Sequence, residues 1–122
     1  MKPCDYKQLK VWQKAMELVE RVYDLVNYLP KEETYALSDQ IRRSAISIPS
    51  NIAEGRGRNS EKEFAQFLSI SRGSLYELIT QLEICQRVGY LKEEQVNKAN
   101  ELADDVGKML YALSKQMIED NQ

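Results

Sequence analysis

Basic side chains in the middle of the chain are the residues whose chemistry stands out most. Residues 41–90 carry more arginine and lysine than aspartate and glutamate, although the whole chain has a formal net charge of −2. Arg56, Arg58 and Lys62 surround a predicted break between two helices, where the free N–H groups of the second helix favour an anion. Together with Arg42, they are the candidate phosphate contacts of a nucleic-acid-binding surface. The alternative is a solvated surface without a ligand.

The glycines beside these arginines suggest a phosphate-binding loop, but the surrounding sequence argues against one. The segment reads Gly55-Arg56-Gly57. A dinucleotide-binding fingerprint requires a preceding strand within a βαβ unit, and no strand pattern is present. We therefore interpret the segment as a turn between helices and predict no cofactor.

The chain lacks the residue types on which most catalytic and metal sites depend. It contains no histidine, the commonest general base and transition-metal ligand, and only two cysteines. Carboxylate-bridged metal bundles use a Glu-x-x-His motif, which this chain cannot supply. We predict no catalytic residue among Glu54, Glu63 and Glu77 and no metal site.

A second group of polar residues is expected to hold the bundle or its interfaces. Arg43, Ser47, Asn51 and Glu54 lie beside the apolar stripe of a predicted helix. Polar groups next to a core need hydrogen-bonded partners. Antiparallel pairing with the next helix places Arg43 opposite Glu77, which predicts a salt bridge between them.

Gly73 lies among small residues inside that next helix. Glycine in a helix interior costs about 1 kcal/mol relative to alanine, so its presence calls for a compensating contact. Two interpretations stay open. Gly73 allows close packing between the second and third helices of one subunit, or it lies in a contact between subunits.

Length and composition indicate one globular domain. The chain has 122 residues, of which 43% are hydrophobic and 30% charged. No segment approaches the roughly 20 apolar residues of a membrane span, and the first residues lack the apolar core of a signal peptide. We expect a single domain over residues 1–122, located in the cytoplasm and without a membrane partner.

Apolar residues recur at three- and four-residue spacing along almost the whole chain, which is the helical period. Breaks near Pro30, 55–59 and 89–92 predict four helices, at about 5–28, 32–55, 60–88 and 93–119. Short connections make successive helices antiparallel, so the expected fold is an all-α, up-down-up-down four-helix bundle.

Local signals support the helix starts. Asp5 with Gln8, and Ser60 with Glu63, have the spacing of capping boxes. The acidic pair at 32–33 suits the first turn of the second helix.

Pro49 lies inside the second predicted helix. It removes one backbone hydrogen bond and crowds the preceding turn. Because the apolar pattern continues to Ala53, we predict a kink rather than an end. Ser44 and Ser47 are near enough to hydrogen-bond a freed carbonyl.

The middle of the chain resembles a known family. Its central run is QIRRSAISIPSNIAEG at 40–55, and further matching segments lie at 9–15, 63–64, 67–68, 73–78, 81–82 and 89–90. These segments resemble the bacterial four-helix bundle proteins, also called 23S rRNA intervening-sequence or S23 proteins. Ser44 stands where the family usually has alanine.

The resemblance implies a left-handed up-down-up-down bundle that often assembles as a ring-shaped homopentamer, and it implies no enzymatic activity. Some members are encoded within insertions in large-subunit rRNA genes. A related branch, the accessory variability determinant of diversity-generating retroelements, binds nucleic acid and a reverse transcriptase. That branch is notably basic, whereas this chain is slightly acidic.

These observations lead to three hypotheses. The first is a non-enzymatic homo-oligomer, pentameric by the resemblance, that acts as a scaffold associated with RNA or another nucleic acid. The second is a protein-interaction adaptor without a nucleic-acid role. The third is an enzyme, which an ordered metal or a deep polar pocket would favour.

Overall fold

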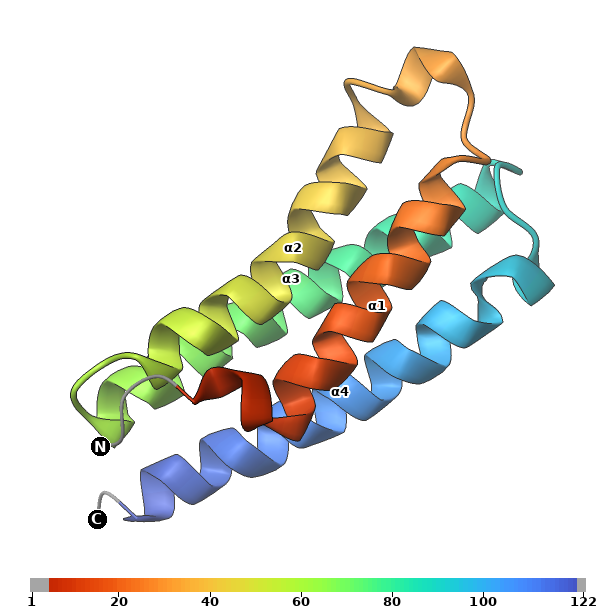
Figure 1. Cartoon of the computed structure of the whole chain (residues 1–122). Helices are drawn as coiled ribbons and strands as arrows, with labels where there is room; N and C mark the ends of the chain where they lie inside the picture. The colour runs from red at the N-terminus through yellow and green to blue at the C-terminus, as the bar shows by residue number, and fades with distance from the viewer. Residues whose placement is uncertain (1–4, 121–122) are drawn as a thin grey trace.

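Four long helices make up almost all of the computed structural model, which describes residues 5–120. Two short 3-10 helices precede α1 and α2. Successive α-helices run in opposite directions (Figure 1), and the predicted all-α four-helix bundle is confirmed. The elements are η1 (Tyr6–Gln8), α1 (Lys10–Val26), η2 (Lys31–Glu33), α2 (Leu37–Arg56), α3 (Glu61–Arg87) and α4 (Glu93–Asp120).

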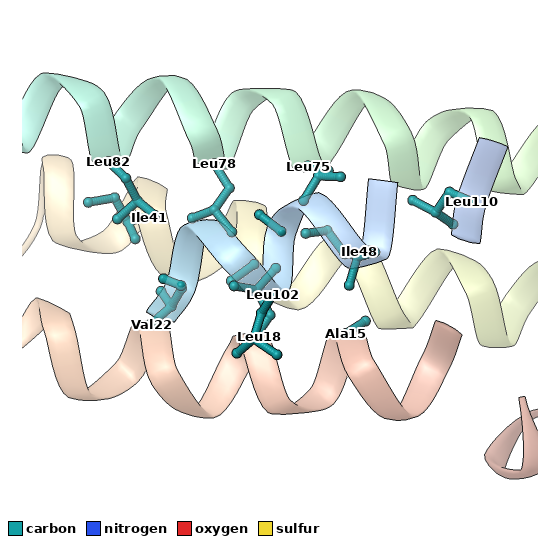
Figure 2. Close-up of a cluster of buried hydrophobic side chains, with 14 of the residues drawn as sticks. Ala15, Leu18, Val22, Ile41, Ile48, Leu75, Leu78, Leu82, Leu102 and Leu110 are labelled. Carbon is teal, nitrogen blue, oxygen red and sulfur yellow. The ribbon is translucent and has the colours of Figure 1, made fainter. Parts of the chain in front are cut away.

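Each helix packs against two others, in the cyclic order α1, α2, α3, α4 and back to α1. Figure 2 shows labelled apolar side chains from all four helices pointing into one shared interior. Leu18, Ile48 and Leu78 have no exposed surface, and Leu102 is also buried. Full burial of one such side chain stabilises the fold by about 1.5–3 kcal/mol. Within residues 5–120, no helix is both long and apolar enough to cross a membrane.

The first α-helix begins later than the sequence predicts. Residues 6–8 form a 3-10 helix, and Leu9 is extended, with φ −71° and ψ 125°. The Asp5 side chain makes no capping hydrogen bond and instead forms an ion pair with Arg56 at 2.9 Å. The predicted capping box at Asp5 is therefore wrong, because a tertiary contact takes the carboxylate that would have capped the helix. Residues 1–4 of the expected domain, like 121–122, lie outside the described residues.

The second α-helix also begins later, at Leu37 rather than near residue 32. The acidic pair belongs to η2, and Ala36 breaks the helix with φ −122° and ψ −101°. Glu33 nevertheless acts on the helix from outside it, since its Oε1 accepts a hydrogen bond from the Leu37 N–H at 3.3 Å. Its Oε2 accepts a 2.8 Å hydrogen bond from the Tyr90 hydroxyl, which raises the pKa of Tyr90. This contact joins the chain before α2 to the turn after α3.

Helix α2 continues through Pro49, as the apolar pattern predicts, and a kink there stays a prediction. The hydroxyl of the fully buried Ser71 donates a 2.8 Å hydrogen bond to the Ile48 carbonyl, one residue before the proline. The Ser47 hydroxyl lies 2.8 Å from that of Ser74. Ser47, Ser71 and Ser74 therefore join α2 to α3. The expectation that Ser44 or Ser47 would hydrogen-bond a freed carbonyl is wrong, since Ser47 contacts the Ser74 hydroxyl and it is Ser71 of α3 that reaches a carbonyl.

The bounds of α3 and α4 lie within one residue of their predicted positions. Ser60 caps α3, because its hydroxyl accepts a hydrogen bond from the Glu63 N–H at 3.1 Å. Gly89 follows the end of α3 with φ 87°, a left-handed conformation that stops a helix and favours glycine.

Close approach of α2 and α3 occurs at Gly55, near the turn that joins them. A Cβ atom on Gly55 would lie 2.5 Å from Cβ of Phe67 and 3.0 Å from Cδ1 of Phe64. At Gly73, an added Cβ would meet nothing within 4 Å. Close packing within one subunit therefore does not explain Gly73, and its role in a subunit contact stays a prediction.

The two glycines should respond oppositely to alanine. Gly55→Ala should destabilise the fold by about 1–3 kcal/mol, because the new methyl group overpacks the contact with Phe67. Within a single copy, Gly73→Ala should stabilise the fold by up to about 1 kcal/mol, because alanine favours helix and its methyl group has open space. Urea unfolding followed by circular dichroism measures both. Equal free energies of unfolding in the two variants would contradict this account of α2–α3 packing.

Candidate nucleic-acid interface

Two of the predicted phosphate contacts at the α2–α3 turn already have carboxylate partners. Arg56 is largely buried and lies 2.9 Å from Asp5, on the segment before α1. Arg58 lies 2.7 Å from Glu54, one helical turn earlier, and its guanidinium carbon is 4.8 Å from the centre of the Phe67 ring. Both cations are held in place and their charge is locally balanced.

The other two predicted contacts differ in position and in partners. Arg42 lies near the start of α2, about 20 Å from Arg56 along the helix, and donates a 3.3 Å hydrogen bond to the Thr34 carbonyl. The structure therefore does not bring Arg42 together with the turn residues. Lys62 is exposed in the first turn of α3 and has no carboxylate partner within residues 5–119.

Several predicted structural residues lie along the seam between α2 and α3. The Asn51 amide donates hydrogen bonds to the carbonyl and hydroxyl oxygens of Ser47, at 2.8 and 2.9 Å. This group continues across the seam to Ser74. The network is compact and partly buried, and it ties the two helices together with neutral groups.

The predicted salt bridge between Arg43 and Glu77 is absent. Arg43 instead pairs with Asp39 at 3.1 Å, within its own helix. Arg43 and Glu77 line the same shallow hollow of about 300 Å³ between α2 and α3. Their helices are paired roughly as predicted, but a partner one turn away is easier for Arg43 to reach than one across the seam.

Sequence reasoning did not identify the cluster formed by Arg72, Tyr76 and Tyr111. The Arg72 guanidinium carbon lies 5.7 Å from the ring centre of Tyr76 on α3 and 5.2 Å from that of Tyr111 on α4. Spacing of four residues indicates the first contact, whereas the second depends on how α3 and α4 pack. Both tyrosines are 54% exposed.

This cluster lies within a long surface depression between α3 and α4. Three hollows of about 350, 490 and 490 Å³ adjoin one another there. The hollow of about 350 Å³ shares Arg72 and Tyr111 with one of the two hollows of about 490 Å³, and that hollow shares Ser114 and Ile118 with the other. We call this depression the α3–α4 groove, and its polar and aromatic lining includes Lys62, Arg72, Tyr76, Lys108, Tyr111 and Lys115.

The α3–α4 groove is net positive. Two carboxylates, Asp104 and Glu119, line it beside its four cations. Lys108 pairs with Asp104 at 3.0 Å and Lys115 with Glu119 at 4.0 Å. Arg72 has no carboxylate partner among the described residues, so its charge, like that of Lys62, is uncompensated.

A second groove, between α1 and α2, carries no charge. Its hollow of about 330 Å³ is lined by Tyr6, Trp12, Met16, Val19, Ile46, Pro49, Ser50 and Ala53. The Tyr6 and Trp12 rings meet edge to face, 5.4 Å between centres. Met16 and Ile46 are 36% and 42% exposed. We call this the α1–α2 groove.

The described residues offer little that resembles a reaction centre. Within residues 5–120, no group of three or more histidine, cysteine, aspartate or glutamate side chains is placed to hold a metal ion. Burial, with a smaller contribution from the Glu33 carboxylate, raises the pKa of the Cys85 thiol from 9.0 to about 11. Cys85 is therefore protonated at neutral pH and unsuited to nucleophilic attack.

Comparison with known proteins adds a family and a fold. A family model described as "23S rRNA-intervening sequence protein" matches residues 7–112. A crystal structure from Bacteroides thetaiotaomicron, described as a protein with unknown function from the S23 ribosomal protein family, is 30% identical to this chain. The similarity covers 86% of this chain and 98% of that one, with a TM-score of 0.79. No curated protein matches the chain.

Proposed function

The chain belongs to the 23S rRNA-intervening sequence protein family, and from this premise we propose that it is a non-enzymatic, homo-oligomeric scaffold that associates with RNA or another nucleic acid in the cytoplasm. The family description names no reaction, and the similar structure is of a protein of unknown function. The observation that carries the nucleic-acid part of the proposal is the positive charge of the α3–α4 groove.

The α3–α4 groove is a local positive region on a chain that is slightly acidic overall, and such a region favours an anionic ligand. The chain has a formal net charge of −2, yet this groove places four cations beside two carboxylates. Phosphate backbones bind such surfaces through release of counterions. Lys62 lines the groove and lies in the first turn of α3, directly after the α2–α3 turn that carries the predicted contacts Arg56 and Arg58.

The α1–α2 groove supports the homo-oligomeric part of the proposal. An uncharged, partly exposed depression with aromatic and aliphatic lining suits the core of a protein interface, where charged residues are depleted. The resemblance of the sequence to ring-forming proteins favours a pentamer. The exposed Gly73 on α3 offers a second, small-residue surface to a neighbouring copy.

A protein-interaction adaptor is the second candidate function. The same α1–α2 groove favours it, because a different protein would find the same uncharged surface there. In this case an affinity purification after nuclease treatment should enrich one protein partner in a fixed ratio to this chain.

Binding of RNA at two salt concentrations, with the particle mass measured on the same sample, tests the proposal. If three or four phosphates are contacted, affinity should fall about twenty- to fifty-fold between 50 and 200 mM salt, because the slope for single strands is about 0.7 per contact. The particle should have a mass several times that of the 14.2 kDa chain. Absence of binding at 50 mM salt would refute the nucleic-acid role, and a monomeric mass would refute the scaffold.

Release of one paired arginine tests the contribution of the α2–α3 turn. Glu54→Gln removes the partner of Arg58, so RNA affinity should rise and the salt slope should steepen by about one contact. Glu83→Gln is the matched control, since it frees Arg87 from a pair of the same spacing at the far end of α3. Equal effects of the two substitutions would show that overall charge, and not the turn, determines binding.

A charge placed in the α1–α2 groove tests its role in self-association. Ile46→Glu should lower the particle mass while helicity is retained, because the buried carboxylate would have no partner in the interface. Ile84→Glu on α3 is the control, since Ile84 and Ile46 are 41% and 42% exposed. Analytical ultracentrifugation measures both. An unchanged mass for Ile46→Glu would place the interface elsewhere.

A further inference from the structure

We infer that the α3–α4 groove selects single-stranded over double-stranded nucleic acid, by stacking unpaired bases on Tyr76 and Tyr111 around Arg72. This inference rests on the proposed nucleic-acid role and specifies the ligand of that groove. It depends on the geometry of the three side chains and on the shape of the depression around them.

The arrangement of Arg72, Tyr76 and Tyr111 forms an aromatic and cationic platform. The guanidinium lies between two rings from different helices, with its carbon atom 5.7 and 5.2 Å from their centres. Cation–π attraction holds such a group in place. Each tyrosine is about half exposed, so surface for a stacked base remains on both. Base stacking on aromatic side chains and on arginine is the common basis of sequence-tolerant single-strand binding.

The positive charge on Arg72 is available to a ligand because no carboxylate in the described part of the chain neutralises it. Among residues 5–119 it has no carboxylate partner, and its Nε atom is buried without a hydrogen bond. An unsatisfied buried donor is costly, so the group is unusual as a purely structural feature. A phosphate at the mouth of the groove would balance the charge while the neighbouring bases contact the rings.

The length and charge of the groove fit a strand of several nucleotides. From Ile79 to Lys62 the groove follows α3 for about 25 Å. Lys62 lies towards one end, and Lys108 and Lys115 lie along the α4 side. A strand in this groove would have cations beside its phosphates and tyrosines beside its bases.

A duplex cannot use the same platform well. Its bases are stacked on one another and expose only their edges, whereas unpaired bases can splay out onto aromatic side chains. A duplex would therefore contact the cations alone. A helix from a second copy of this chain is also a poorer fit, because lysine, aspartate and glutamate, which line this groove at five positions, are depleted at protein interfaces.

Fluorescence anisotropy with a labelled 12-nucleotide RNA, free or annealed to its complement, tests the inference on the full-length oligomer. The single strand should bind at least about tenfold more tightly than the duplex. Tyr76→Leu combined with Tyr111→Leu should weaken single-strand binding by about tenfold or more and leave duplex binding nearly unchanged. Tyr76→Phe combined with Tyr111→Phe, which keeps both rings, should retain the preference.

Tyr23→Leu is the matched control, because Tyr23 lies on α1 and is 42% exposed. It should bind both RNAs as the unchanged chain does. If the double leucine variant fails to fold, Arg72→Gln decides alone, because it removes only the cation between the rings.

Several outcomes would overturn the inference. Equal binding of single strand and duplex, or full single-strand affinity in the double leucine or the Arg72→Gln variant, would overturn it and leave the proposed nucleic-acid role intact. A changed particle mass in the double leucine variant would show that the groove joins copies of this chain. Absence of binding to either RNA would refute the proposed function as well.

Discussion

The burial of one apolar stripe from each of four helices determines the rest of the structure. Each fully buried leucine or isoleucine contributes about 1.5–3 kcal/mol, whereas an exposed ion pair contributes about 0–1 kcal/mol. The shared interior shown in Figure 2 therefore sets how the helices are rotated and paired. The polar contacts on the seams follow from that pairing, as the hydrogen bond from Ser71 to the Ile48 carbonyl illustrates.

Whether a contact is local or joins distant parts of the chain explains which features could be predicted from the sequence. Helix α3 begins and ends where local signals place it, because Ser60 and Gly89 act on the backbone beside them. The starts of α1 and α2 could not be predicted, because Asp5 and Glu33 serve contacts with residues far away in the chain. A capping pattern predicts a helix start only where no tertiary partner competes for the capping side chain.

The candidate site shows the same limit. The α2–α3 turn could be predicted as a place where basic residues gather, because they are neighbours in the sequence. Arg72 and Tyr76 are one turn apart, so their contact was also within reach of sequence analysis. The approach of Tyr111 depends on the rotation of α4 against α3, which only packing determines. The pairing of Arg43 with Asp39 was likewise within reach of the sequence, because the two residues are one helical turn apart.

The placement of the two grooves matters for a scaffold. Because the helices pack in cyclic order, the seam between α1 and α2 lies opposite the seam between α3 and α4. Copies joined through the uncharged α1–α2 groove would leave the positive α3–α4 groove of every copy accessible. A weak single-strand site repeated around such an assembly would gain overall affinity from its effective concentration, without any new contact. Under this proposal a chain that is slightly acidic overall would bind a polyanion, since its net charge would matter less than the repetition of one positive groove.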